Sequence, residues 1–236
     1  MEKHTNQPSF DEFQKRIGVS FNDRKILRQA FVHRSYINEN RSSSLKHNER
    51  LEFLGDAVLE LVVTDYLYVT YPSKPEGELT SLRAALVNTQ ALSEVAREIG
   101  INDELYLSRG EAKDTGRARD FILADAVEAL IGALYFDKGY DESKLFIERF
   151  VVPRLETVLK EGSWIDAKSM FQENAQEVVN ETPLYKVLEE SGPDHDKFFT
   201  SGVFLGDEQI ATGQGKSKQE AEQEAARQAL EAKGWS

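Results

Sequence analysis

Residues 48–68 read NERLEFLGDAVLELVVTDYLY, and this stretch decides how the N-terminal part of the chain folds. Its apolar residues recur every three or four positions, the spacing of a helix packed against a core. Its first four acidic residues are Glu49, Glu52, Asp56 and Glu60. Because they are spaced three, four and four positions apart, they fall within an arc of about 80° on one helix face. The stretch predicts a largely buried helix with an acidic face, and no Lys or Arg occurs from residue 51 to residue 73.

A second stretch, residues 120–137 (DFILADAVEALIGALYFD), repeats this arrangement. Asp125 and Glu128 are three positions apart and therefore share one face of the predicted helix. Ala129 and Gly132 lie beside them on that face, and the stretch contains no basic residue. Small neighbours would let another helix or a ligand approach the two carboxylates closely.

Two interpretations of the acidic faces are open. One is that each face is solvated, as charged runs usually are. The other is that the carboxylates share a hard divalent cation, because like charges on apolar helices are costly to desolvate and oxygen ligands favour Mg²⁺, Mn²⁺ or Ca²⁺. A di-iron bundle is disfavoured, because it uses Glu-x-x-His pairs and no histidine here follows a Glu by three residues. The histidines are His4, His33, His47 and His195.

The composition limits the environment and the partners of the chain. It has 236 residues, 40% of them hydrophobic, and no Cys, so it can bury a core but cannot form disulfides or thiolate metal sites. No stretch approaches the roughly 18 apolar residues of a membrane span, and the N-terminus lacks the apolar core of a signal peptide. We therefore expect a cytoplasmic protein with no membrane partner. The net charge of −12 disfavours nucleic acid, but phosphate binding needs only a local basic patch.

The spacing of apolar residues divides the chain into two domains. Residues 1–160 are predicted to be helical nearly throughout, residues 161–165 to form a linker, and residues 166–236 to form a second domain. In the first domain we predict helices near 23–32, 48–70, 79–99, 121–137 and 141–159, and a loop at 108–120. Gly100 follows the 79–99 pattern as its predicted stop.

The second domain is predicted to have the order α-β-β-β-α. A helix over 167–179 is followed by strands over 184–188, 198–205 and 209–212 and by a final helix over 218–232. Gly206, Asp207 and Glu208 form a predicted hairpin turn, and Ser217 and Glu220 a predicted capping box before the last helix. The predicted fold class is therefore an all-helical domain followed by an α+β domain.

Three blocks of the sequence resemble the ribonuclease III family: HNERLEFLGDAVLEL at 47–61, PEGELTSLRAALVN at 75–88 and LADAVEALIGALYFDKG at 123–139. The tail after Asp166 resembles a double-stranded-RNA-binding domain. This resemblance covers nearly the whole chain, in the order that the family has. It implies a homodimeric endonuclease that hydrolyses double-stranded RNA with water activated by Mg²⁺, for which Mn²⁺ would substitute. The products would carry 5′-phosphate and 3′-hydroxyl ends, and the role would be maturation of ribosomal and messenger RNA.

The resemblance also assigns roles to single residues. The positions that match the family's metal-binding carboxylates are Glu52, Asp56, Asp125 and Glu128. Among these we expect Asp56 and Glu128 to be catalytic, with Glu128 the most critical. Glu49 and Glu76 match acidic residues that assist, and Phe53 matches an aromatic residue at the family's dimer interface. Without the resemblance, Phe53 is equally well interpreted as a core residue.

The resemblance also implies that the second domain binds RNA through a small set of residues. They are Gln172, Gln176, His195, Lys216 and Lys218. From residue 166 onward, seven Lys and Arg stand against fourteen Asp and Glu, so composition alone does not indicate RNA. The two lysines flank the start of the last predicted helix, where backbone N–H groups favour phosphate. Gln219 stands where the family usually has a basic residue, so we expect modest RNA affinity.

The main alternative to an enzyme is a regulator that binds double-stranded RNA without cleaving it. The set of four carboxylates disfavours this alternative, because a protein that only binds RNA has no use for them. His33 and Arg34 also match a family block, and we interpret both as structural residues that bond to a neighbouring helix.

Overall fold

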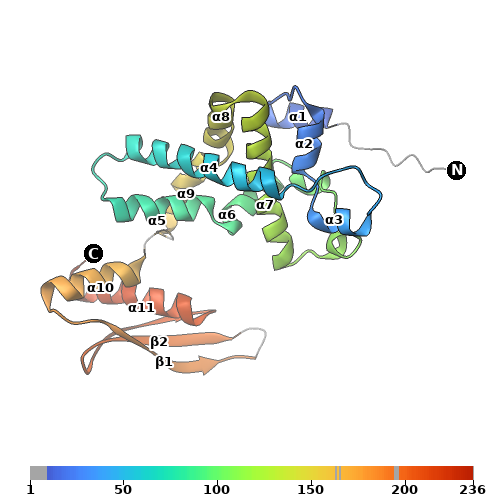
Figure 1. The fold of residues 1–236 in the computed structure, drawn as a ribbon. Helices are drawn as coiled ribbons and strands as arrows, with labels where there is room; N and C mark the ends of the chain where they lie inside the picture. The colour runs from blue at the N-terminus through green and yellow to red at the C-terminus, as the bar shows by residue number, and fades with distance from the viewer. Residues whose placement is uncertain (1–9, 163, 165, 194–196, 236) are drawn as a thin grey trace. The chain divides into compact units, whose positions relative to one another are not determined.

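The computed structural model describes residues 10–162, 164, 166–193 and 197–235, which belong to two compact units (Figure 1). Residues 1–164 make up the first unit and residues 165–236 the second. Each unit has its own hydrophobic core. The predicted fold class, a helical domain followed by a domain of α-β-β-β-α order, is confirmed.

The first unit consists of α-helices joined by short loops and 3₁₀ turns. Its described α-helices are α1 (Asp11–Ile17), α2 (Arg24–Ala30), α3 (Arg34–Glu39), α4 (Glu49–Thr70), α5 (Glu76–Val87), α6 (Thr89–Glu98), α7 (Arg117–Lys138), α8 (Tyr140–Phe150) and α9 (Leu155–Glu161). The 3₁₀ helices are η1 (Ile101–Asp103), η2 (Glu111–Lys113) and η3 (Val152–Arg154).

The helices α4 and α7 have 22 residues each and cross at the centre of this unit (Figure 1). Their apolar faces contribute to the core, where Leu59 and Val62 of α4 and Val127 and Leu130 of α7 are fully buried. The apolar spacing of the two acidic stretches thus predicted both helices correctly. Burial of these faces leaves the acidic positions near the line where the helices cross.

Two glycines allow α4 and α7 to approach each other closely. A Cβ added at Gly55 would lie 1.7 Å from the carbonyl oxygen of Glu128, and one at Gly132 would lie 2.0 Å from the carbonyl oxygen of Leu51. Nonbonded atoms cannot come so close, so any side chain at either position would push the helices apart. Because Glu52 follows Leu51, this contact also brings the acidic positions of the two helices together.

The structure corrects two of the predicted helices. The 79–99 pattern is divided into α5 and α6 at Asn88, whose backbone is extended and whose side chain accepts a hydrogen bond (2.9 Å) from the N–H of Ala91. The predicted helix at 141–159 is divided by η3, which contains Pro153. In both places the apolar spacing continues across the break, so periodicity did not reveal it. Gly100, the predicted stop, has a φ of 76°, in the left-handed region that favours glycine.

The second unit packs two helices on a three-stranded antiparallel sheet (Figure 1). Its elements are α10 (Ala167–Val178), β1 (Leu184–Ser191), β2 (Phe198–Leu205), β3 (Glu208–Gly215) and α11 (Lys218–Lys233). The strand order is β1-β2-β3, with a two-residue turn between β2 and β3 in which Gly206 has a φ of 53°. Phe171 of α10 and Val203 of β2 are fully buried in the core between the sheet and the helices.

The last helix begins with the predicted side-chain cap, with one difference. The Ser217 hydroxyl accepts a hydrogen bond from the N–H of Glu220 (3.1 Å). The Glu220 carboxylate accepts one from the N–H of Lys216 (2.9 Å), one residue before the position that a capping box uses. The first turn of α11 is therefore fixed by two reciprocal contacts.

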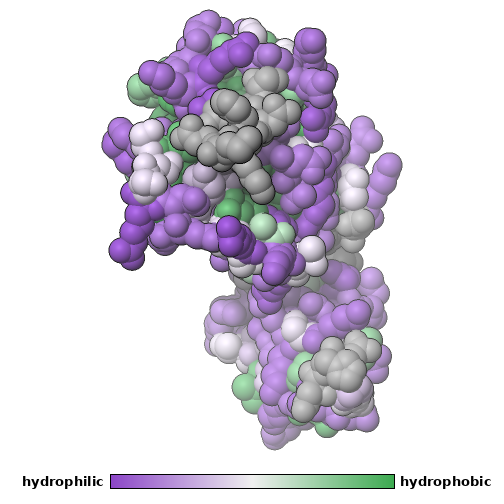
Figure 2. All heavy atoms as spheres, turned by 90° about the vertical axis from the view of Figure 1, so that its right-hand side faces the viewer, coloured by the Kyte–Doolittle hydropathy of each residue, from purple (hydrophilic) through white to green (hydrophobic). Residues whose placement is uncertain are grey.

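One face of the molecule is mainly polar. The face shown in Figure 2 is mainly hydrophilic, and hydrophobic residues are visible on it only as separate patches. Among the helices within the described ranges, none is long and apolar enough to cross a membrane.

Replacing Gly55 or Gly132 by Ala should destabilise the first unit, because the added methyl group would overlap a carbonyl of the facing helix. We expect the free energy of unfolding to fall by about 1–3 kcal/mol or more, the usual penalty for overpacking a core. The measurement is urea unfolding followed by circular dichroism.

Gly77→Ala is the matched control. Gly77 lies in the first turn of α5, and a Cβ at this position would meet no atom of the described chain within 4 Å. Since Ala favours a helix over Gly by roughly 0.5–1 kcal/mol, stability should stay equal or rise. If Gly55→Ala were as stable as Gly77→Ala, the close contact between α4 and α7 would be contradicted.

Candidate functional site

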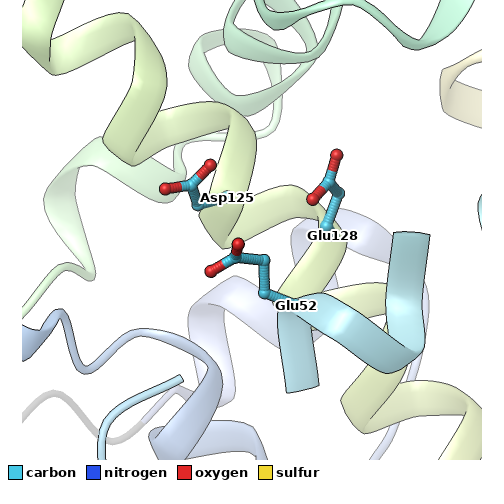
Figure 3. Close-up of side chains that lie close together, drawn as sticks. All are labelled: Glu52, Asp125 and Glu128. Carbon is cyan, nitrogen blue, oxygen red and sulfur yellow. The ribbon is translucent and has the colours of Figure 1, made fainter. Parts of the chain in front are cut away.

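Three carboxylates meet where α4 crosses α7. Glu52, Asp125 and Glu128 each offer one carboxylate oxygen, and these atoms all lie within 4.8 Å of one another. Figure 3 shows the three side chains, one from α4 and two from α7, gathered in one region between the helices. All three are half-buried. We call these three residues the carboxylate cluster.

Asn48 fixes the start of α4 and thereby the position of Glu52. Its buried side chain donates from Nδ2 to the carbonyl oxygen of Ala30 (3.2 Å), and its backbone N–H donates to that of Val32 (2.9 Å). Its own carbonyl accepts a hydrogen bond from the N–H of Glu52 (3.0 Å). This role of Asn48 could not be predicted from the sequence, because an Asn before a helix predicts a cap and not a tertiary contact.

Burial and mutual repulsion raise the pKa values of the cluster. Burial, followed by the charges of the neighbouring carboxylates beginning with Asp56, raises the pKa of Glu128 from 4.5 to about 8. Burial, followed by the charge of Asp125, raises the pKa of Glu52 from 4.5 to about 7. The pKa of Asp125 is also raised, by burial and then by the charge of Glu49. Without a cation, the cluster therefore holds protons near neutral pH.

The cluster fits a hard divalent cation. Within the part of the chain that the structure describes, no basic side chain lowers the pKa of Glu52, Asp125 or Glu128. Oxygen ligands without nitrogen or sulfur suit Mg²⁺, Mn²⁺ or Ca²⁺, and a divalent charge would favour the ionised carboxylates. The alternative of a freely solvated acidic face does not account for the burial of these three side chains.

Comparisons with known proteins identify both units. Residues 23–155 match the family model described as ribonuclease-III-like, and residues 167–233 match the double-stranded RNA binding motif. The chain belongs to the ribonuclease III family. Proteins named Ribonuclease 3 from Carboxydothermus hydrogenoformans and Shouchella clausii are 48% and 46% identical to it. These matches cover 92% and 94% of this chain and 93% and 85% of the two relatives.

A solved member of the ribonuclease III family is also similar in structure. The nuclease domain of ribonuclease III from Campylobacter jejuni has a TM-score of 0.56 and 35% sequence identity, and the match covers 61% of this chain and 96% of that domain. The family and the enzyme class that the sequence predicted are thus confirmed. This chain is a ribonuclease III-type endonuclease with a double-stranded-RNA-binding domain.

Three acidic residues assigned from the ribonuclease III pattern lie outside the cluster: Asp56, Glu76 and Glu49. Asp56 is one turn after Glu52 on α4 and is exposed, although its charge still raises the pKa of Glu128. Glu76 is the first residue of α5, is exposed, and accepts a hydrogen bond (3.0 Å) from the Thr80 hydroxyl. The fold thus brings together three of the four metal ligands expected from the family. The fourth, Asp56, lies outside the cluster and is exposed to solvent.

Glu49, the other auxiliary acid, is paired with Arg34. The Arg34 Nη1 donates to the Glu49 carboxylate (3.0 Å), so the basic residue of the family block links α3 to the first turn of α4. The Arg34 side chain is 61% exposed and bonds to a neighbouring helix, as interpreted from the sequence. His33 caps α3 by accepting a hydrogen bond from the N–H of Ser35 (3.3 Å).

Phe53 is not a core residue. Its side chain is 81% exposed on α4, directly after Glu52. The structure therefore excludes the alternative that sequence alone left open for this aromatic ring.

The structure describes all but one of the expected RNA-binding residues. Gln172 and Gln176 are exposed on α10, one turn apart. Lys216 and Lys218 are exposed on either side of the cap of α11, and Lys218 Nζ bonds to the Glu190 carboxylate of β1 (2.9 Å). His195 lies outside the described residues. No pattern in the sequence indicated Glu190, because this contact forms only when β1 and α11 fold together.

The stability of the metal-free protein should depend on pH through Glu128. Because the folded pKa of about 8 lies above the ordinary 4.5, the folded state binds more protons than the unfolded state between these values. The contribution of Glu128 to stability is therefore present below pH 4.5 and is lost as the pH rises toward 8. The measurement is the thermal midpoint of the wild type and of Glu128→Gln in chelator from pH 5 to 8.5.

We expect the variant to gain stability relative to the wild type as the pH rises. Glu156→Gln, an exposed position on α9, is the control and should show no such trend. Added Mg²⁺ should then stabilise the wild type more than Glu128→Gln at pH 8, because ion binding requires ionised carboxylates. Parallel pH curves for all three proteins would contradict the raised pKa.

Proposed function

We propose that this enzyme cleaves both strands of RNA duplexes by hydrolysis, using Mg²⁺ held by Glu52, Asp56, Asp125 and Glu128. The observation that supports this most directly is the carboxylate cluster, in which three half-buried acids from two helices meet without a basic partner in the described chain. Such a site is stable in ionised form only when a cation joins it. Mn²⁺, with similar ligand preferences, should substitute.

The residues of the cluster would divide the work of phosphodiester hydrolysis. When bound, the ion supplies positive charge beside the phosphate and a water of lowered pKa. Glu52, Asp125 and Glu128 would hold it, and the exposed Asp56 would complete the ligand set. Attack of water on phosphorus, with departure of the 3′ oxygen, leaves a 5′-phosphate and a 3′-hydroxyl.

The second unit would hold the duplex. Gln172 and Gln176 suit 2′-hydroxyl and base-edge contacts in a minor groove, and Lys216 and Lys218 suit phosphates at the start of α11. His195 would contact the next minor groove. We propose that the substrates are structured precursors of ribosomal and messenger RNA in the cytoplasm, and that residues 166–236 act as the RNA-binding domain.

Glu128→Gln tests the cleavage proposal. The variant keeps the shape of the side chain but removes a ligand charge, so cleavage of a long RNA duplex in Mg²⁺ should fall by about a hundredfold or more. Duplex binding, measured in Ca²⁺ by gel shift, should stay within about twofold, because Ca²⁺ supports binding with looser geometry.

Glu156→Gln serves again as the control and should cleave like the wild type. End-group analysis of the wild-type products checks for 5′-phosphates. If Glu128→Gln cleaved as fast as Glu156→Gln, the cluster would not be the catalytic centre. The alternative of a non-cleaving regulator predicts instead that the wild type binds the duplex and does not cut it.

We further propose that the enzyme is a homodimer and that Phe53 lies in its interface. The exposure of this ring supports the proposal. The related Campylobacter jejuni structure is described as showing flexibility in a region involved in dimer formation. Each subunit would contribute one carboxylate cluster, and the two would cut opposite strands to leave short 3′ overhangs.

Phe53→Ser should weaken the dimer while leaving each subunit folded. Loss of a buried interface aromatic typically costs about 2 kcal/mol or more, so the dissociation constant should rise by roughly thirtyfold or more. Sedimentation equilibrium gives this constant. Leu145→Ser, which removes an exposed apolar side chain from α8, is the control and should leave it unchanged. Equal dissociation constants for the two variants would show that Phe53 does not lie in the interface.

A further inference from the structure

Lys218 is the first residue of α11, where a helix attracts phosphate. Ser217 caps this helix, and backbone N–H groups and the helix dipole favour an anion at its start. The Lys218 Nζ lies 5.6 Å from the centre of the Phe199 ring on β2, so the stem of the side chain lies over the sheet. Among the basic side chains of the second unit, Lys218 is therefore well placed to meet a phosphate.

Lys218 already forms a salt bridge with a carboxylate of the same unit. Glu190 of β1 places a carboxylate oxygen 2.9 Å from the Lys218 Nζ, the distance of a charge-assisted hydrogen bond. The hydrogen bond and the charge of Lys218, together with the charge of Lys197, lower the pKa of Glu190. Glu190 is thus ionised at neutral pH, and its charge faces the site expected for a phosphate.

We propose that Glu190 competes with RNA phosphate for Lys218 and thereby sets the affinity and the salt dependence of duplex binding. This inference rests on the proposed function, in which Lys218 contacts the duplex. The competitor is intramolecular and is presented by the adjacent sheet, so its effective concentration does not fall on dilution.

Electrostatic repulsion opposes the binding of a carboxylate and a phosphate to the same ammonium group. An ammonium has three donors, but two anions bonded to it would lie within a few ångströms of each other and repel. A phosphate must therefore displace Glu190 or be accompanied by an additional cation. Displacement is feasible because the pair is solvated: the side chains of Lys218 and Glu190 are 57% and 43% exposed, and exposed ion pairs are weak.

The same competition affects the dependence of binding on salt. When a lysine neutralises a phosphate, the RNA releases about one condensed cation, and binding weakens as salt rises. If Glu190 loses its lysine in that step, its charge next to the phosphate takes up a cation from solution. The cation taken up by Glu190 offsets the cation released by the RNA. In the wild type, the affinity should therefore fall less steeply with salt than the number of phosphate contacts implies.

Glu190→Gln and Glu189→Gln form a matched pair that tests the proposal. Both residues are exposed on β1, and both substitutions remove one negative charge. Glu190 is paired in register with Phe199, below Lys218, whereas Glu189 is paired with Thr200 and points to the opposite face. A general effect of net charge should appear equally in both variants, and competition for Lys218 only in Glu190→Gln.

Duplex affinity is measured for the full-length variants by fluorescence anisotropy in EDTA, which prevents cleavage, over a range of KCl concentrations. We expect Glu190→Gln to bind about two- to fivefold more tightly than Glu189→Gln at low salt, the range that an exposed ion pair can supply. Its plot of log affinity against log salt should be steeper by up to about one unit. In a Lys218→Ala background the two variants should bind alike.

Two results would overturn the inference. Equal affinities and slopes for Glu190→Gln and Glu189→Gln would show that Glu190 does not compete. Weaker binding by Glu190→Gln would show that it orients Lys218 for the phosphate instead. A failure of the proposed contact between Lys218 and the duplex gives a different result, because Lys218→Ala would then bind the duplex as tightly as the wild type at every salt concentration.

Discussion

The contact between Gly55 and Gly132 is the constraint on which the catalytic unit depends. With no Cβ at either position, the backbones of α4 and α7 come close enough for a carbonyl of each helix to fill the space where a side chain would be. One of these carbonyls belongs to Glu128 and the other to Leu51, the residue before Glu52. A wider crossing would keep both helices and their apolar cores, but it would separate the carboxylates and remove the cation site.

Charge, rather than apolar packing, limits the stability of the same region. The crossing buries part of three carboxylates that have no basic partner among the described residues, and burial raises their pKa values. Lysines or arginines at these positions would stabilise the metal-free fold, but they would also displace a divalent ion. The enzyme therefore accepts a strained electrostatic site in its metal-free state, and binding of a cation relieves it.

Periodicity predicted most of the fold, because burial of one helix face or one sheet face leaves a repeat in the sequence. The helices α4 and α7 and the α-β-β-β-α order of the second unit follow from such repeats. The division between α5 and α6 did not, because Asn88 ends one apolar pattern and begins another in phase with it. The break depends on a backbone conformation and a side-chain cap, and neither leaves a periodic signal.

The sequence by itself determined the chemistry of the protein: which acids lie on which helix faces, and, through its motifs, the ribonuclease III family. Only the tertiary structure decided which of those groups meet. It placed Glu52, Asp125 and Glu128 together, left Asp56 and Phe53 exposed to solvent, and paired Lys218 with Glu190. The physical reason is that spacing along a chain fixes the direction of a side chain within its own helix or strand. Distances between elements depend instead on how closely their backbones can pack.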